Sequence, residues 1–177
     1  MNLYVTRHGQ TDGNLYRIMD GIRDIDLNEE GIKQAHTTQE LLKDVQFDLI
    51  ICSPLTRTKH TMEIININKA PVAYDERIIE RDCGEYTGKS FDSLDRDWYW
   101  NYNNKTIYEK AENIDVLFKR VYEFLDDIKE KYKDKNILLV THSGVTKVIN
   151  CYFNGVPEDG NLQTLGLKNC EVKMYDL

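Results

Sequence analysis

The sequence lacks the features that mark several specialised classes of protein. No apolar run approaches the roughly 18 residues of a membrane-spanning helix, and no basic segment precedes an apolar one at the N-terminus, as a secretory signal requires. There is also no internal repeat, low-complexity segment or linker. We therefore expect a soluble, cytoplasmic protein with no membrane partner. At 177 residues, 41% hydrophobic and 30% charged, it is expected to form a single domain over residues 1–177.

Positive charge is also scarce. Lys and Arg number 23 against 30 Asp and Glu, which gives a formal net charge of −7. Non-specific binding to nucleic acid or to an anionic membrane needs a basic face, so this composition opposes a nucleic-acid partner. Any site for an anion must be a local cluster of cations on an acidic molecule.

Paired cysteines are missing as well. The four cysteines are scattered without a CxxC pair, which argues against a zinc knuckle or a thioredoxin-type motif. We expect reduced thiols, most of them structural, at Cys52, Cys83, Cys151 and Cys170.

What the sequence does contain is an alternation of short apolar runs and helical patterns. The runs predict strands at residues 3–5, 47–52 and 136–141, and residues 165–167 and 171–175 are expected to complete the sheet. A polar loop is expected over residues 9–28.

Four helices are expected between these strands. Asn28 can cap one that runs to about Lys43, and Ser53-Pro54 predicts a hydroxyl cap with proline at the first helical position of the next. A further helix follows His142-Ser143-Gly144 to about Phe153. The fourth is indicated by an apolar stripe of helical period, formed by Ile114, Leu117, Val121, Leu125, Ile128 and Tyr132.

This alternation predicts an α/β fold, a three-layer α/β/α arrangement with a mainly parallel central sheet. Parallel strands end at the same edge of a sheet, where α/β proteins bind ligands. Arg7-His8 follows the first strand, Ser53 to Arg57 follows the second, and His142 follows the strand at 136–141. The topology therefore brings two imidazoles, two arginines and a helix N-terminus together, and such a terminus favours anions.

Four motifs carry a family resemblance. They are Arg7-His8-Gly9-Gln10-Thr11 with Asn14, Gly21, Asp24, Leu27 and Gly31; Ser53-Pro54-Leu55-Thr56-Arg57-Thr58; Glu80-Arg81-Asp82-Cys83-Gly84-Glu85-Tyr86-Thr87-Gly88; and Thr141-His142-Ser143-Gly144. In residue type and order they resemble the histidine phosphatase superfamily, the phosphoglycerate mutase-like proteins of branch 1. Asp20 departs from the pattern, since family members often carry a neutral residue there, and it could repel a second anionic group.

The resemblance implies a role for each motif residue. His8 would be the nucleophile that becomes phosphorylated, Arg7, Arg57 and His142 would hold the phosphoryl oxygens, and Glu80 would be the general acid and base. Asn14 and Gly21 would line the phosphate and substrate side. The resemblance also implies that no metal or other cofactor is needed, and that the partner is a small phosphorylated metabolite.

Physical reasoning supports the same assignment. A phosphate monoester repels anionic nucleophiles, so a neutral imidazole among fixed cations is a suitable attacker, and arginine matches phosphate geometry better than lysine does. Catalysis of phosphoryl transfer is mainly positioning and charge stabilisation.

Several assignments stay open. Asp82 and Glu85 share the segment of Glu80, and either could supply the proton. Residues 89–110 are rich in aromatic side chains, which could form a lid over the substrate or the packing face of a covering helix. Cys83 is interpreted as a structural thiol near the pocket.

The leading hypothesis is a metal-independent phosphomonoesterase that acts through a phosphohistidine on His8. A cofactor-dependent phosphoglycerate mutase and a phospho-ligand-binding module without chemistry are the alternatives. The mutases carry an extra basic segment after the third motif, where this chain offers only Lys89, Arg96 and Lys105. A serine nucleophile at Ser143 is excluded because Thr141 stands where the G-x-S-x-G motif requires glycine. The identity of the ester is undetermined, and a homodimer is left open.

Overall fold

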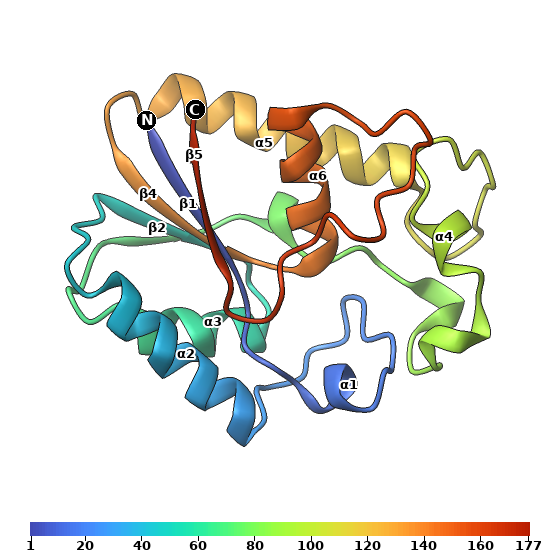
Figure 1. Cartoon of the computed structure of the whole chain (residues 1–177), viewed down its shortest axis with the longest axis horizontal. Coiled ribbons are helices and arrows are strands. Elements are labelled where there is room, and N and C mark those ends of the chain that lie inside the picture. The colour runs from blue at the N-terminus through green and yellow to red at the C-terminus, as the bar shows by residue number, and fades with distance from the viewer.

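A computed structural model describes residues 1–177 and has a central sheet of five strands (Figure 1). Their spatial order is β3-β2-β4-β1-β5. β1, β4, β2 and β3 run parallel, and only β5 is antiparallel, on the outer side of β1. The mainly parallel sheet predicted from the sequence is therefore confirmed. The strands are β1 Asn2–Arg7, β2 Leu49–Cys52, β3 Val72–Tyr74, β4 Asn136–Thr141 and β5 Val172–Asp176.

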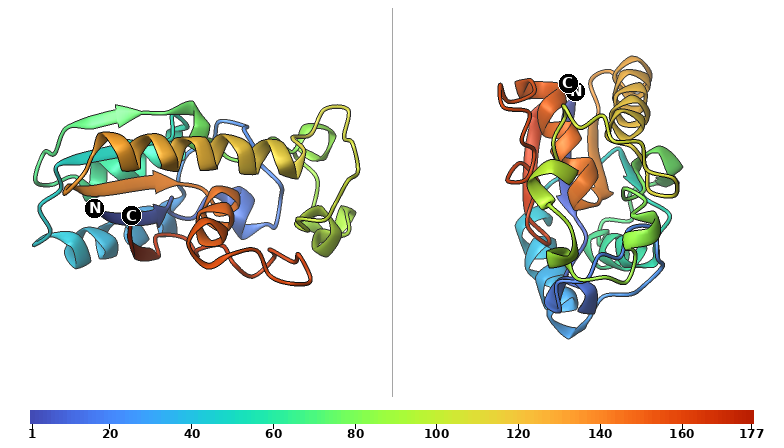
Figure 2. Two further views of the ribbon diagram at one scale, coloured as in Figure 1. Left: turned by 90° about the horizontal axis from the view of Figure 1, so that it is seen from above. Right: turned by 90° about the vertical axis from the view of Figure 1, so that its right-hand side faces the viewer.

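Helices cover both faces of this sheet, as the views in Figures 1 and 2 show. α2 and α3 pack together on one face, and α5 and α6 pack together on the other. The helices are α1 Asp12–Leu15, α2 Glu29–Leu42, α3 Thr56–Ile65, α4 Arg96–Tyr99, α5 Ile114–Lys131 and α6 Ser143–Asn154. Short 3₁₀ turns lie at Glu76–Ile78, Gly84–Tyr86 and Phe91–Ser93.

The central strand β4 divides the core between the two helical layers. Ile137 and Leu139 belong to the cluster that contains α5 and α6, whereas Leu138 and Val140 belong to the cluster that contains α2 and α3. Successive side chains of a strand point to opposite faces, so a strand covered on both sides reads as a continuous apolar run. The predicted three-layer arrangement is confirmed by this division.

Two long helices follow their sequence signals closely. Asn28 caps α2, since its side-chain oxygen accepts a hydrogen bond from the backbone N–H of Gly31 (2.9 Å). α5 buries the predicted stripe of Ile114, Leu117, Val121, Leu125 and Ile128, and it ends at Lys131. Tyr132 forms the C-cap and lies just past the helix.

Three local predictions are wrong. Ser53 does not cap α3, which begins at Thr56 behind Leu55; the Ser53 hydroxyl instead hydrogen-bonds with Nε2 of His142 (2.7 Å). Residues 165–167 form no strand, because the backbone N–H of Leu167 donates to the Thr146 hydroxyl on α6 (3.0 Å) rather than to a neighbouring strand. The loop expected over residues 9–28 contains the short helix α1.

All four cysteines are unpaired and buried, in agreement with the expected reduced thiols. No helix combines the length and apolar character that crossing a membrane requires. No three side chains of His, Cys, Asp or Glu are grouped so that they could hold a metal ion.

Candidate active site

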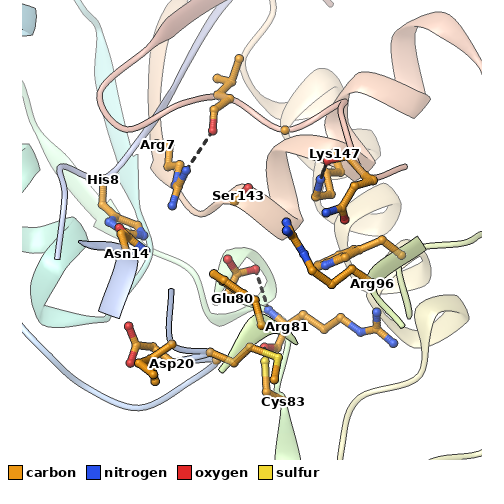
Figure 3. A pocket seen from close by; sticks show the side chains of 18 of the residues that line it. Arg7, His8, Asn14, Asp20, Glu80, Arg81, Cys83, Arg96, Ser143 and Lys147 are labelled. Atoms are coloured by element: carbon orange, nitrogen blue, oxygen red, sulfur yellow. Dashed lines mark hydrogen bonds between the residues drawn. The ribbon is translucent and has the colours of Figure 1, made fainter. Parts of the chain in front are cut away.

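The strand ends meet as predicted at one edge of the sheet. Arg7 is the last residue of β1, His142 directly follows β4, and Arg57 lies in the first turn of α3, which follows β2. A pocket of about 280 Å³ opens beyond this edge (Figure 3). The predicted site residues that line it are Arg7, His8, Asn14, Gly21, Arg57 and Glu80. His142 is fully buried and is not part of the wall, although its ring centroid lies 5.2 Å from that of His8.

His8 is held as a neutral imidazole with one nitrogen free. Its Nδ1 lies 2.7 Å from the carbonyl oxygen of Gly9. Since a carbonyl only accepts, Nδ1 carries the hydrogen and Nε2 keeps its lone pair. Burial, reinforced by the charges of Arg7 and Arg57, holds the pKa of His8 well below its usual value. His8 is therefore unprotonated at neutral pH, as a nucleophile must be.

The turn that carries His8 packs unusually close to α2. A Cβ on Gly9 would lie 2.4 Å from the carbonyl oxygen of Gly31, and a Cβ on Gly31 would lie 2.1 Å from that of Gln10. Only glycine fits at both positions, because neither backbone can move away without shifting an element. The first turn of α2 thus fixes the position of the loop that follows β1.

Two arginines, the buried Arg57 and the half-buried Arg7, supply positive charge beside His8. Arg57, 1% exposed, donates to the carbonyl oxygens of Gly21 (2.7 Å) and Arg23 (2.8 Å), which fixes the orientation of its guanidinium. Arg7 donates to the carbonyl oxygen of Leu167 (3.3 Å). Burial lowers the pKa of Arg7 to about 10, so it stays charged at neutral pH.

His142 contributes a buried donor. Its Nε2 lies 2.7 Å from the Ser53 hydroxyl, and its Nδ1 has no partner. A hydroxyl can donate or accept; when Ser53 donates to Nε2, the ring hydrogen lies on Nδ1 and can be donated to a ligand. Nε of Arg7 is likewise buried and unpartnered. Buried polar atoms without partners are rare in folded proteins, so two in one site indicate that an anionic ligand completes it.

Of the three candidate proton donors Glu80, Asp82 and Glu85, only Glu80 lines the pocket. Its carboxylate accepts hydrogen bonds from the backbone N–H groups of Gly144 (3.1 Å) and Arg81 (2.9 Å). Any Cβ at position 144 would lie 2.3 Å from the Glu80 carboxylate, so glycine permits this contact. Asp82 and Glu85 do not line the pocket, and Asp82 instead accepts from the backbone N–H of Gly84 (2.8 Å).

Asn14 and Gly21 also line the pocket. The Asn14 side-chain oxygen accepts from the backbone N–H of Thr11 (3.2 Å) and from the Asn169 amide (3.0 Å). Asn169 also donates to the backbone carbonyl of His8 (3.0 Å), so Asn14 and His8 share a support. Gly21 has φ of +51°, a left-handed conformation that favours glycine.

Side chains of the aromatic segment, residues 89–110, either line the pocket or pack inside the protein. Phe91 and Trp100 line the pocket. Tyr99 is buried, and its ring lies 3.8 Å from the Arg81 guanidinium, which also donates to the Tyr99 carbonyl (2.7 Å). Different side chains of residues 89–110 thus line the pocket and pack inside the protein, and Arg81, the residue next to Glu80, contacts the segment at Tyr99.

Other lining residues were not identified from the sequence as part of the site. They include Arg96, Ser143, Lys147, Gln163 and Lys168. One signal was available for Lys147: a lysine among Val145, Val148 and Ile149, on a helix directly after a buried strand, lies in an apolar stretch that is expected to face the core. Nothing in the sequence places Gln163 or Lys168.

The chain is similar to known proteins in both sequence and structure. The model of the histidine phosphatase superfamily (branch 1) matches residues 3–177. A Bacillus subtilis protein named "Uncharacterized phosphatase PhoE" is 33% identical over 166 residues, which cover 93% of this chain and 82% of that protein. Phosphoserine phosphatase 1 of Hydrogenobacter thermophilus is 26% identical, over 88% of this chain and 77% of its own. The crystal structure of the α-ribazole phosphatase from Shigella flexneri superposes with a TM-score of 0.86 at 27% identity, covering 100% of this chain and 91% of that chain.

Proposed function

The chain belongs to the histidine phosphatase superfamily (branch 1) and is a phosphoric monoester hydrolase, and on that premise we propose that it acts on small phosphorylated metabolites through a phosphohistidine on His8. The observation that carries the proposal is the state of His8. It is a neutral imidazole, its Nδ1 is bound to Gly9, its Nε2 is free, and the charges of Arg7 and Arg57 lie beside it. This combination is suited to attack on a phosphorus atom.

The first step transfers the phosphoryl group. Nε2 of His8 forms a bond to phosphorus while the bond from phosphorus to the ester oxygen breaks. The protonated Glu80 carboxyl gives its hydrogen to that leaving oxygen, and the alcohol departs. A single placed acid contributes typically about 10²- to 10⁴-fold to the rate of such a step.

The second step releases phosphate. Water attacks phosphorus, Glu80 takes a proton from this water, and the bond from phosphorus to Nε2 breaks. Inorganic phosphate leaves and His8 returns to its neutral form. Glu80 ends protonated, ready for the next ester.

The fixed donors stabilise charge in both steps. Arg7, Arg57 and Nδ1 of His142 bind the phosphoryl oxygens, and their positions are set before substrate arrives by the hydrogen bonds to Leu167, Gly21 and Ser53. Donors that are already oriented need no reorganisation in the transition state. Their charge replaces that of a metal ion, so the proposal includes metal independence.

The relatives' names support small substrates. α-Ribazole phosphatase and phosphoserine phosphatase are named for small phosphorylated molecules, and the pocket here, about 280 Å³, is near the lower limit of ligand pockets. The four free, buried cysteines support a reducing, cytoplasmic location.

The test measures phosphate release from a panel of phosphate monoesters with EDTA present, for wild type and His8→Ala. We expect wild-type activity to survive chelation, and His8→Ala to lose it while its melting temperature stays within a few degrees of wild type. His36→Ala, an exposed histidine on α2, is the matched control and retains activity. Substantial activity in His8→Ala would rule out the phosphohistidine. Stimulation by 2,3-bisphosphoglycerate would instead indicate a mutase.

A further inference from the structure

Four basic residues that line the pocket have no role in the proposed reaction, and Arg96 and Lys147 are two of them. Arg96 from α4 and Lys147 from α6 both line it. Figure 3 shows them beside one another, on the opposite side of the pocket from His8 and Asn14. Neither forms an ion pair with any carboxylate of the protein. Their charge is therefore available to a ligand.

Gln163 holds both cations in place. The Lys147 ammonium donates to the backbone carbonyls of Leu162 (2.9 Å) and Gln163. With its amide oxygen turned toward Arg96, the Gln163 side chain accepts from Nε (2.9 Å) and Nη2 of that guanidinium. An ammonium has three hydrogens and a guanidinium has five, so each cation keeps donors for a further acceptor.

The surroundings of Lys147 also require an anion. Its side chain is 5% exposed and lies 5.2 Å from the Trp100 ring. Burial, together with the charges of Arg7 and Arg96, lowers the pKa of Lys147 to about 8, although Glu80, and less strongly Cys151 on its own helix, act to raise it. Burying a charge is costly unless it is paired. A ligand anion at this end of the pocket would supply the missing pair.

We propose that Arg96 and Lys147 bind a carboxylate of the substrate, so that the enzyme selects small phosphate monoesters of carboxylic acids. This inference rests on the proposed function of the same site. Bidentate pairing with carboxylates is a property of arginine, and the pocket volume limits the spacer to a few atoms. Asp20 lines the pocket away from these cations and is paired with Arg23, so the anionic end of the substrate is directed toward Arg96 and Lys147.

The test compares esters that differ mainly in the carboxylate. O-Phosphoserine is paired with O-phosphoethanolamine, and 3-phosphoglycerate with glycerol 3-phosphate. We expect wild type to prefer the carboxylate member of each pair by at least about 10-fold in kcat/KM. In Lys147→Met and Arg96→Gln this ratio falls by about 10-fold or more, mainly through KM, as expected for a contact present in both ground and transition states.

Two controls separate binding from general damage. Lys105→Gln removes an exposed cation outside the pocket and leaves the ratio unchanged. In wild type, the preference for carboxylate esters declines as the pH rises through about 8, because Lys147 loses its proton. Lys147→Arg keeps its charge and therefore retains this preference at pH 9.

The outcomes distinguish this inference from the function on which it rests. The inference would be overturned if wild type hydrolyses p-nitrophenyl phosphate but shows no preference for carboxylate esters. It would also be overturned if the variants lower kcat/KM equally for all four esters. Either result would leave the phosphatase mechanism standing. A preference for 1,3-propanediol bisphosphate over every carboxylate would assign the two cations to a second phosphate. Wild type inert on every ester would overturn both proposals.

Discussion

Single residues determine where the hydrogens of the site lie. The Gly9 carbonyl fixes the hydrogen of His8 on Nδ1, whereas the Ser53 hydroxyl contacts Nε2 of His142 and leaves Nδ1 of that ring without a protein partner. Both rings are kept neutral by burial and by neighbouring arginines, which lower the pKa of each. One histidine can therefore attack while the other donates, although their ring centroids are only 5.2 Å apart.

The proton donor is testable at this scale. We expect Glu80→Gln to lower kcat for alkyl phosphates by about 10²- to 10⁴-fold, because the leaving alkoxide then lacks its acid. For p-nitrophenyl phosphate the loss in the first step is smaller, since that leaving group needs no proton. Steady-state and burst kinetics with the two esters would measure the difference.

Asp82→Asn is the matched control for this measurement. The amide oxygen of the new side chain can still accept from the backbone N–H of Gly84, so the turn is preserved and activity is expected to stay within a few-fold of wild type. The assignment of Glu80 fails if Asp82→Asn, rather than Glu80→Gln, shows the loss that depends on the leaving group.

The sequence predicted the residues at strand ends more successfully than those on the loops that cover the pocket. Arg7, His8 and Arg57 line the pocket because parallel strands end at one edge, a rule that needs only the strand positions. Arg96, on the short helix α4, and Gln163, between α6 and β5, reach the pocket along chain paths that no local sequence pattern specifies. His142 was placed at the right edge, but its position behind the pocket wall depends on side-chain packing.

Secondary-structure elements were predictable where they were long or buried. β4 and α5 have the expected bounds because a continuous apolar run and a helical stripe are strong signals. β3 has three residues and α1 has four, too few to show a period, and neither was predicted. Leu167 is buried, as in a strand, but its backbone N–H bonds to a side chain of α6 instead.

The contact between α2 and the His8 loop predicts whether the substitution Gly31→Ala stabilises or destabilises the protein. Gly31→Ala in a helix would ordinarily stabilise by about 0.5–1 kcal/mol. Here we expect it to destabilise by about 1–3 kcal/mol, because the new Cβ meets the Gln10 backbone. Urea unfolding would measure the change, and activity should fall as the loop is displaced. Thr37→Ala, exposed on the same helix, should stay within about 0.5 kcal/mol of wild type. If Gly31→Ala stabilises the protein instead, the loop that carries His8 can move away from α2 without loss of stability.

The molecule as a whole concentrates its scarce positive charge in one place. Although the net charge is −7, the pocket is lined by six basic residues and only two acidic ones. An acidic surface around a cationic pocket repels polyanions but admits a small phosphate ester. The basic lining residues are Arg7, Arg57, Arg81, Arg96, Lys147 and Lys168.

This concentration of charge carries a cost in stability that depends on pH. His8 and His142 resist protonation in the folded state, because burial and the arginines lower the pKa of both rings. In the unfolded chain each binds a proton as the pH falls through about 6.5. The unfolded state then binds more protons than the folded state, so the free energy of unfolding must decrease as the pH decreases.

We expect a decrease of about 2–3 kcal/mol between pH 7.5 and pH 5.5, about half from each histidine. Asp48 and Asp75, whose pKa values are lowered by hydrogen bonds from neighbouring residues, lose their contribution only nearer pH 4, below this window. Urea unfolding at a series of pH values would give the slope, and His8→Asn should remove about half of it. An unchanged slope in His8→Asn would mean that His8 accepts a proton in the folded enzyme, and the neutral nucleophile on which the mechanism depends would then be absent over this range of pH.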